Sequence, residues 1–212
     1  MHRQKGISLI SLLIGLLVSS IVIVGMMMIF RNTIQTAVPS SESARSEGER
    51  ISALLAAHMM LQDAGFGTDG AQAEHLRVLS SASFSGTTLS ASGSGTAVVW
   101  RKTISTTHTC EGLYADGVGS LWRLDSDGCG STGIDLSSIS WSRTPLVGES
   151  RARESNDDDF VRLIEIEPVT GNCSPFGISS SITGGLAVRL KYSVNVGGTN
   201  QEVESTTCLA NF

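Results

Sequence analysis

ISLISLLIGLLVSSIVIVGMMMIF, residues 7–30, is the stretch that decides the fold of this 212-residue chain. It contains no charged residue and no proline. About 20 consecutive apolar residues are enough for a helix to cross the roughly 30 Å hydrocarbon core of a bilayer. Residues 7–30 therefore predict a transmembrane helix, and the mostly polar remainder of the chain is expected to lie outside the lipid.

A short polar segment, MHRQKG (residues 1–6), precedes this helix. Arg3 and Lys5 place two positive charges directly before the span, and such charges favour the cytoplasmic side of a membrane. We therefore expect a single pass with a cytoplasmic N-terminus and an extracytoplasmic C-terminal domain. The apolar run continues well past Ser19 and Ser20, the small residues at which a secretory signal would have to be cut, so an N-terminal anchor fits better.

Residues 31–67 predict that the helix continues beyond the membrane with one apolar face. Pro39 removes a backbone donor and predicts a kink or a break nearby. Gly65 and Gly67 suit the left-handed conformation that follows a helix end. The apolar face is predicted from positions at helical spacing, namely Ile51, Leu54, Leu55, His58 and Leu61.

From residue 68 onward the apolar period changes to that of strands. The loops are predicted at residues 81–95 and 142–159, where Ser, Gly, Thr or charged residues dominate. The helix's apolar face needs a partner and a sheet offers one, so the predicted fold class is α+β, a long helix packed on an antiparallel sheet. The strand candidates are residues 76–80, 96–104, 119–124, 134–141 and 160–166, and the hairpin formed by 185–196 and 201–208. Three tryptophans in these candidates, Trp100, Trp122 and Trp141, are expected to pack in the core.

The cysteines all lie beyond residue 100 and predict disulfides. An even number of cysteines in an exported domain is typical of a disulfide framework. Four cysteines allow three connectivities, and we favour pairing of sequence neighbours because each bond then closes a local loop. The favoured pairs are Cys110–Cys129 and Cys173–Cys208.

The charge balance argues against a nucleic-acid-binding surface. Lys and Arg number 15 and Asp and Glu number 20, which gives a formal net charge of −5. Contact with phosphates needs clustered Lys and Arg, so we predict no nucleic-acid partner. The sequence also lacks the G-x-S-x-G, H-E-x-x-H and P-loop motifs, and the predicted class is not an enzyme.

Two acidic stretches are the candidate ion sites, and neither has a complete ligand pattern. Residues 125–130 (DSDGCG) resemble the start of a calcium loop, but Cys129 stands at its fifth position and Leu136 at its twelfth, where Glu is needed. Residues 156–159 (NDDD) are typical of a solvated loop. We therefore predict neither a bound metal nor a cofactor.

KGISLI, residues 5–10, followed by the unbroken apolar run, resembles the N-terminus of type IV prepilins. In that family a short basic leader ends in Gly, a membrane-embedded aspartyl prepilin peptidase cuts after this Gly on the cytoplasmic side, and the new terminal residue is N-methylated. The resemblance places the cut between Gly6 and Ile7 and makes Ile7 the methylated terminus. Residues 1–6 are then the leader, and the apolar segment is retained.

A second likeness lies at the predicted end of the helix. ERISALL (residues 49–55) and QDAGFG (residues 62–67) resemble PilW-type minor pilins, in which an Arg and an apolar run precede an acidic residue and then Ala-Gly-aromatic. The resemblance is detailed over residues 1–67 and architectural beyond them. It implies a type IV pilin-like fold, with 7–30 in the membrane or filament core, 31–67 as the amphipathic continuation and 68–212 as the extracytoplasmic β-rich domain.

Ser11 departs from the family pattern, which has Glu at the fifth mature position. In ordinary pilins that Glu is thought to pair with the methylated amine of a neighbouring subunit, and a neutral serine cannot neutralise an amine. One tip-located minor pseudopilin also lacks the Glu, so Ser11 favours a place at or near the filament tip. The alternatives are relaxed constraint in a low-copy subunit, or an ion pair supplied by another minor pilin.

The resemblance implies a minor type IV pilin that takes part in initiating pilus assembly and supports twitching motility, adhesion or DNA uptake. Its implied partners are other minor and major pilins, the prepilin peptidase and the inner-membrane assembly platform. The implied location is the inner membrane and then the pilus at the cell surface. Two alternatives stay open: a J-type minor pseudopilin of type II secretion, and a membrane-anchored envelope domain that binds or adheres.

Overall fold

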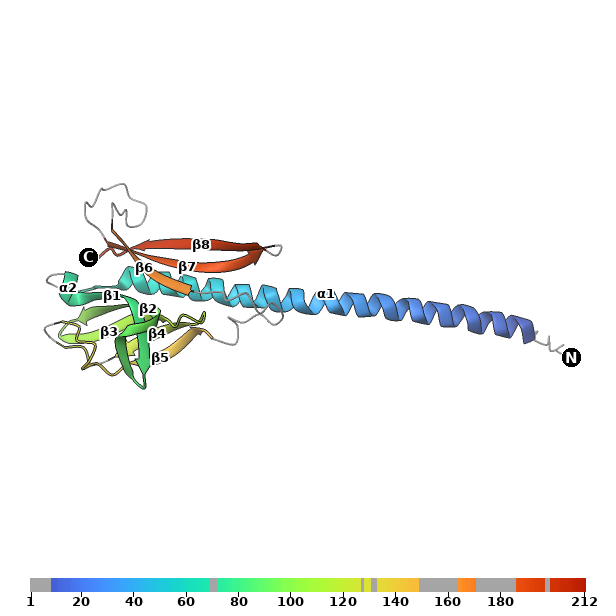
Figure 1. Ribbon diagram of the computed structural model, residues 1–212, viewed down its shortest axis with the longest axis horizontal. Coiled ribbons are helices and arrows are strands. Elements are labelled where there is room, and N and C mark those ends of the chain that lie inside the picture. The colour runs from blue at the N-terminus through green and yellow to red at the C-terminus, as the bar shows by residue number, and fades with distance from the viewer. Residues whose placement is uncertain are drawn as a thin grey trace. The chain divides into compact units, whose positions relative to one another are not determined.

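The computed structural model describes residues 9–68, 72–126, 128–130, 133–148, 164–170, 186–196 and 199–212. The elements within these residues are labelled in Figure 1. The chain divides into two units, Met1–Gly48 and Glu49–Phe212. The long helix α1 (Leu9–Asp63) belongs to both, so the described part of the first unit is helix, and the second unit holds the last turns of α1 together with the sheets.

The N-terminal part of α1 is an apolar helix with an exposed surface. Leu9–Val38 is long and apolar enough to cross a membrane. The hydroxyl groups of Ser19 and Ser20 donate to the carbonyl oxygens of Gly15 and Leu17, each at 2.8 Å. Because these two hydroxyls bond back to the preceding turn, neither is an unsatisfied donor on the helix surface. The surface of this segment therefore suits lipid or an apolar protein environment.

α1 runs through Pro39 as one helix, so of the predicted kink or break at that residue the break is wrong. Proline in a helix interior removes one backbone hydrogen bond and destabilises the helix by about 3 kcal/mol. The other backbone hydrogen bonds of this 55-residue helix offset that cost. Gly65 and Gly67 end the helix as predicted, since their φ angles are 78° and 69°.

The second unit contains two antiparallel sheets where the sequence predicts one. The first has the strand order β1-β2-β3-β4-β5, and the second has the order β6-β7-β8. Figure 1 shows the two sheets on opposite sides of the end of α1. A short helix, α2 (Gln72–His75), leads into the first strand. The strands are β1 (Leu76–Ser85), β2 (Thr88–Ile104), β3 (Thr107–Ala115), β4 (Leu121–Ser126), β5 (Ser142–Val147), β6 (Ile164–Thr170), β7 (Leu186–Val196) and β8 (Thr199–Cys208).

The strand predictions are confirmed best in the C-terminal hairpin, where β7 pairs with β8 as expected. The predictions at 76–80, 96–104 and 119–124 fall on β1, β2 and β4, and the described part of 160–166 falls on β6. The strand predicted at 134–141 is wrong, since those residues form turns and irregular structure. Asp135 explains the difference: its carboxylate accepts bonds from the backbone N–H and the hydroxyl of Ser137, at 3.0 and 2.7 Å, and such turns compete with strand pairing.

Two segments that are predicted as loops, and a third for which no strand is predicted, are in fact strands. Residues 81–95 form most of a long hairpin, because Gly86 takes a φ of 63° at its turn and Leu89 is buried on one of its faces. Residues 142–147 form the edge strand β5, where Pro145 is tolerated because an edge strand leaves some N–H groups unpaired. β3 has no apolar alternation at its polar start, and it forms because β2 and β4 pair with it on both sides.

The main core lies where the end of α1 meets both sheets. Ile51 and Leu55, which belong to the predicted apolar face, are 58% and 60% exposed, so the prediction is wrong at these positions. The face that packs is marked largely by alanines, whose small side chains let the helix approach the sheets closely. The buried helix positions are Ala53, Leu54, Ala57, Leu61 and Ala64, and they pack against Trp100, Leu113 and Leu121 of the first sheet and Ile166, Val188 and Leu190 of the second.

A second core covers the other face of the five-stranded sheet. The hairpin of β1 and β2 extends past the sheet and contributes Ala82 and Leu89, and the segment before β5 contributes Ile139 and Trp141. These side chains pack on Ala97, Val99, Tyr114 and Leu124. The Cys110–Cys129 disulfide, which the sequence analysis favours, joins β3 to the segment that follows β4. The face of the five-stranded sheet that points away from α1 is therefore largely covered rather than exposed to solvent.

The segment after α1 is fixed to β2 and to the C-terminus. The Phe66 carbonyl accepts a bond from the Thr103 N–H at 2.9 Å, and Lys102 forms an ion pair with Asp63. The Asn211 amide donates to the Ala64 carbonyl at 2.9 Å. These bonds hold the end of the helix against the first sheet and explain why the chain needs two glycines there.

Candidate functional site

The site residues taken from the sequence lie in different parts of the chain, and the structure describes only some of them. Gly6 and Ile7 lie outside the described residues, so the cleavage and methylation predictions stay predictions. Ser11 is an exposed residue of α1. Cys208 takes part in a disulfide, whereas Cys173, its predicted partner, lies outside the described residues.

The described residues contain no group of three or more His, Cys, Asp or Glu side chains that are arranged to hold a metal ion. Asp125, the first residue of the calcium-like stretch, accepts bonds from Arg123 at 2.7 and 2.9 Å. Its carboxylate is thus engaged by a cation of the same strand. The second acidic stretch, residues 156–159, lies outside the described residues.

An arginine stacked on aromatic rings is the most distinctive surface feature of the second unit. The guanidinium carbon of Arg143 lies 4.6 Å from the ring centroid of Phe84 and 5.4 Å from that of Trp122. Tyr114 packs edge-on against Phe84, with centroids 5.0 Å apart. We call Arg143, Phe84 and Trp122 the arginine platform. Four strands, β1, β3, β4 and β5, bring these side chains and Tyr114 together.

Asp116 fixes the orientation of the tryptophan in the arginine platform. Its carboxylate accepts a bond from Trp122 Nε1 at 3.3 Å and further bonds from the Val118 and Ser120 N–H groups, each at 3.0 Å. Burial and the Asp116 charge raise the pKa of Tyr114, and the nearby Arg143 charge opposes that rise. Tyr114 is therefore a neutral phenol at physiological pH, and Arg143 is the cation of the platform.

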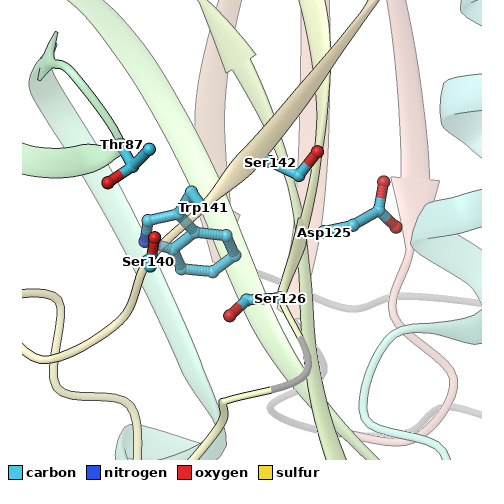
Figure 2. A pocket seen from close by; sticks show the side chains of 6 residues that line it. All are labelled: Thr87, Asp125, Ser126, Ser140, Trp141 and Ser142. Atoms are coloured by element: carbon cyan, nitrogen blue, oxygen red, sulfur yellow. The ribbon is translucent and has the colours of Figure 1, made fainter.

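A hollow of about 410 Å³ lies at the start of β5, next in sequence to Arg143. It is lined by Thr87, Asp125, Ser126, Ser140, Trp141 and Ser142 (Figure 2). Side chains alternate along a strand, so Asp125 and Ser142, which pair in register, face away from Ser126 and Trp141. Figure 2 shows this separation, with Thr87, Ser126, Ser140 and Trp141 on one side of the β4–β5 edge. One ligand in the hollow would thus meet hydroxyl groups and the indole but not the Asp125 carboxylate.

The indole N–H of Trp141 is buried and has no hydrogen-bond partner among the described residues. The Trp141 side chain is only 2% exposed, while its backbone N–H donates to the Thr87 carbonyl at 2.9 Å. A buried donor without a partner costs about 1–3 kcal/mol. Such a donor calls for an explanation, for example a bound water or ligand, and Trp141 differs from the equally unpartnered Trp100 in that it lines a hollow.

Sequence reasoning did not identify the arginine platform. It placed Arg143 in a loop, Phe84 in another loop and Trp122 in the core. Trp122 is in fact half-buried, and Trp100 and Trp141 are the tryptophans that are buried as expected. Contacts among residues so distant in sequence depend on strand order and on the fold-back of the β1–β2 hairpin, which local patterns do not reveal.

Comparisons with models of protein families, with curated proteins and with solved structures found no match.

His58 is a group in the helix–sheet contact that makes stability depend on pH. Its Nδ1 shares a hydrogen bond with Thr207 Oγ1 of β8, and its Nε2 is buried without a partner among the described residues. Burial lowers the pKa of His58 below its ordinary value of 6.5. The unfolded chain therefore binds this proton more tightly than the folded chain, and stability is lost as pH falls below about 6.5 toward the lowered pKa.

We expect the free energy of unfolding of the wild-type chain to fall between pH 7 and pH 5 by more than that of His58→Gln. Chemical unfolding at several pH values, followed by tryptophan fluorescence, measures this slope. Equal slopes in the wild type and His58→Gln would contradict the assignment.

Proposed function

We propose that this chain is a minor type IV pilin of the PilW type, which is processed by a prepilin peptidase and helps to initiate pilus assembly. One observation carries the proposal: an exposed apolar helix, uncharged through Phe30, continues within α1 into a segment that is buried against an α+β head. A helix of this kind serves first as a membrane anchor. After assembly, the same apolar surface is buried against sister helices in a filament core.

The proposal assigns different roles to the two ends of α1. The exposed residues of Leu9–Val38 make the apolar contacts with lipid and then with other pilins. The Cys110–Cys129 disulfide suits an extracytoplasmic head, because disulfides persist in oxidising compartments. The pilus partners are other minor and major pilins and the inner-membrane assembly platform.

Copurification after crosslinking tests the assembly role. An affinity-tagged chain, expressed in a host with a pilus system and crosslinked in intact cells, should copurify with other minor pilins. Recovery of the chain only as a monomer would contradict the role. Recovery with secretion pseudopilins instead would favour the J-type alternative, which shares the same architecture. The identity of the neighbouring genes is an independent observation that distinguishes a pilus system from a secretion system.

Ser11→Glu tests the proposed place of the subunit near the filament tip. A carboxylate at this position is able to pair with the terminal amine of an adjacent subunit, so we expect the variant to spread from the tip into the filament shaft. Immunogold labelling of pili should show a several-fold rise in shaft labelling. Ser19→Glu puts the same charge elsewhere in the span and is the matched control. No change in pilus number or label position in Ser11→Glu would remove the support for a tip location.

A further inference from the structure

We propose that the arginine platform and the neighbouring hollow form a binding site for a carboxylate-bearing saccharide. This inference rests on the second unit alone and does not depend on the proposed assembly role. The two parts are built from the same segments: the β1–β2 hairpin supplies Phe84 and Thr87, and the start of β5 with the residue before it supplies Arg143 and Trp141.

The two parts also face the same side of the sheet. Arg143 pairs in register with Leu124, and Leu124 packs in one core with Trp141. Positions two apart along an extended chain project to the same side and lie about 7 Å apart. The guanidinium of Arg143 leans toward Trp122, which pairs with Pro145, so a ligand that spans both parts needs two or three sugar rings.

Arg143 is prepared to bind an anion. The guanidinium carbon lies over the rings of Phe84 and Trp122, and neither ring offers a hydrogen-bond acceptor in the plane of the N–H groups. Arg143 is exposed, and none of the ion pairs among the described residues involves it. Two parallel N–H groups match a planar carboxylate, and such charge-assisted pairs are stronger than neutral hydrogen bonds.

The hollow adds groups that suit sugar hydroxyls. Its hydroxyl groups, from Thr87, Ser126 and Ser140, both donate and accept hydrogen bonds. The buried Trp141 N–H is a donor that has no acceptor among the described residues. Figure 2 shows the indole nitrogen on the side of Thr87 and Ser140. The whole hollow, the part beside Asp125 and Ser142 included, has a volume of about 410 Å³, and small-molecule sites typically measure roughly 300–1,000 Å³.

The charge of the site selects among anionic ligands. One arginine matches one carboxylate per ring rather than a chain of phosphates. The net charge of −5 further disfavours nucleic acid and other dense polyanions. A uronic-acid type of saccharide, with one carboxylate per ring among neutral hydroxyls and C–H groups, fits both parts.

NMR-detected titration of the full chain in a nonionic detergent tests this assignment. The probes are trigalacturonate, its fully methyl-esterified form, and triglutamate as a peptide carboxylate. We expect trigalacturonate to bind at least about tenfold more tightly than the other two probes. No binding of trigalacturonate, equal binding of the ester, or equal binding of triglutamate would each overturn the saccharide assignment.

Three variants locate the binding. Arg143→Gln should weaken trigalacturonate binding about tenfold or more, whereas Arg77→Gln, at another exposed arginine of the same sheet, should not. Trp141→Phe removes the N–H donor together with part of the buried ring system; it should weaken binding several-fold, and the melting temperature should fall because the smaller side chain leaves a cavity in the core. Unchanged affinity in Arg143→Gln, or in Trp141→Phe, would overturn the site as built.

Discussion

Gly67→Ala is expected to lower the free energy of unfolding of the second unit by about 3 kcal/mol. Gly67 has a φ of 69°, and a Cβ there would collide with the backbone carbonyl oxygen of Thr103. That backbone is not free to shift, since the Thr103 N–H is bonded to the Phe66 carbonyl. The substitution must either break this attachment of α1 to β2 or strain it.

Gly86→Ala is the control for Gly67→Ala. It carries the cost of a side chain at positive φ but not the collision with a neighbouring backbone. Gly86 has a φ of 63°, close to that of Gly67, but no atom lies within 4 Å of the Cβ it would gain. Its loss should cost only about 1 kcal/mol, the penalty of a left-handed residue with a side chain. Urea unfolding followed by the fluorescence of the buried Trp100 and Trp141 gives both values. Equal losses in the two variants would show that the contact with Thr103 contributes nothing.

Leu61→Ala is the second substitution with a large expected effect. Leu61 is fully buried between the end of α1 and the sheets. Removal of a buried leucine side chain costs the lost transfer free energy and leaves a cavity, which together amount to about 3–4 kcal/mol. The same unfolding measurement should show the midpoint of the transition shifted strongly to lower urea.

Leu55→Ala is the matched control on the same helix. Leu55 is 60% exposed, so its truncation should change stability by less than about 0.5 kcal/mol. The pair therefore tests which face of the helix packs against the sheets. A larger loss in Leu55→Ala than in Leu61→Ala would mean that the packed face is the one first expected from the large apolar residues.

The sequence predicts the elements whose signals are local. The uncharged run of residues 7–30 predicts the apolar helix, Gly65 and Gly67 predict its end, and the alternation around 197–200 predicts the β7–β8 hairpin. The Cys110–Cys129 disulfide follows from proximity in sequence. Each of these features depends on residues that are neighbours along the chain, so a pattern in the sequence suffices.

The elements that escape prediction depend on partners distant in sequence. β3 begins with polar residues and is a strand because β2 and β4 flank it. The packed face of α1 is set by Ala53, Ala57 and Ala64, whose small size matters only once two sheets lie against the helix. The arginine platform likewise exists only because the β1–β2 hairpin brings Phe84 over β5.

The mature N-terminus tests the proposed function most directly. The chain should be expressed in a host that has a prepilin peptidase, and the purified protein should be analysed by intact-mass and N-terminal peptide mass spectrometry. We predict a chain that begins at N-methylated Ile7, and a Gly6→Glu variant that keeps residues 1–6. A wild-type chain that begins at an intact Met1 would contradict the proposal and would leave a plain membrane-anchored domain in its place.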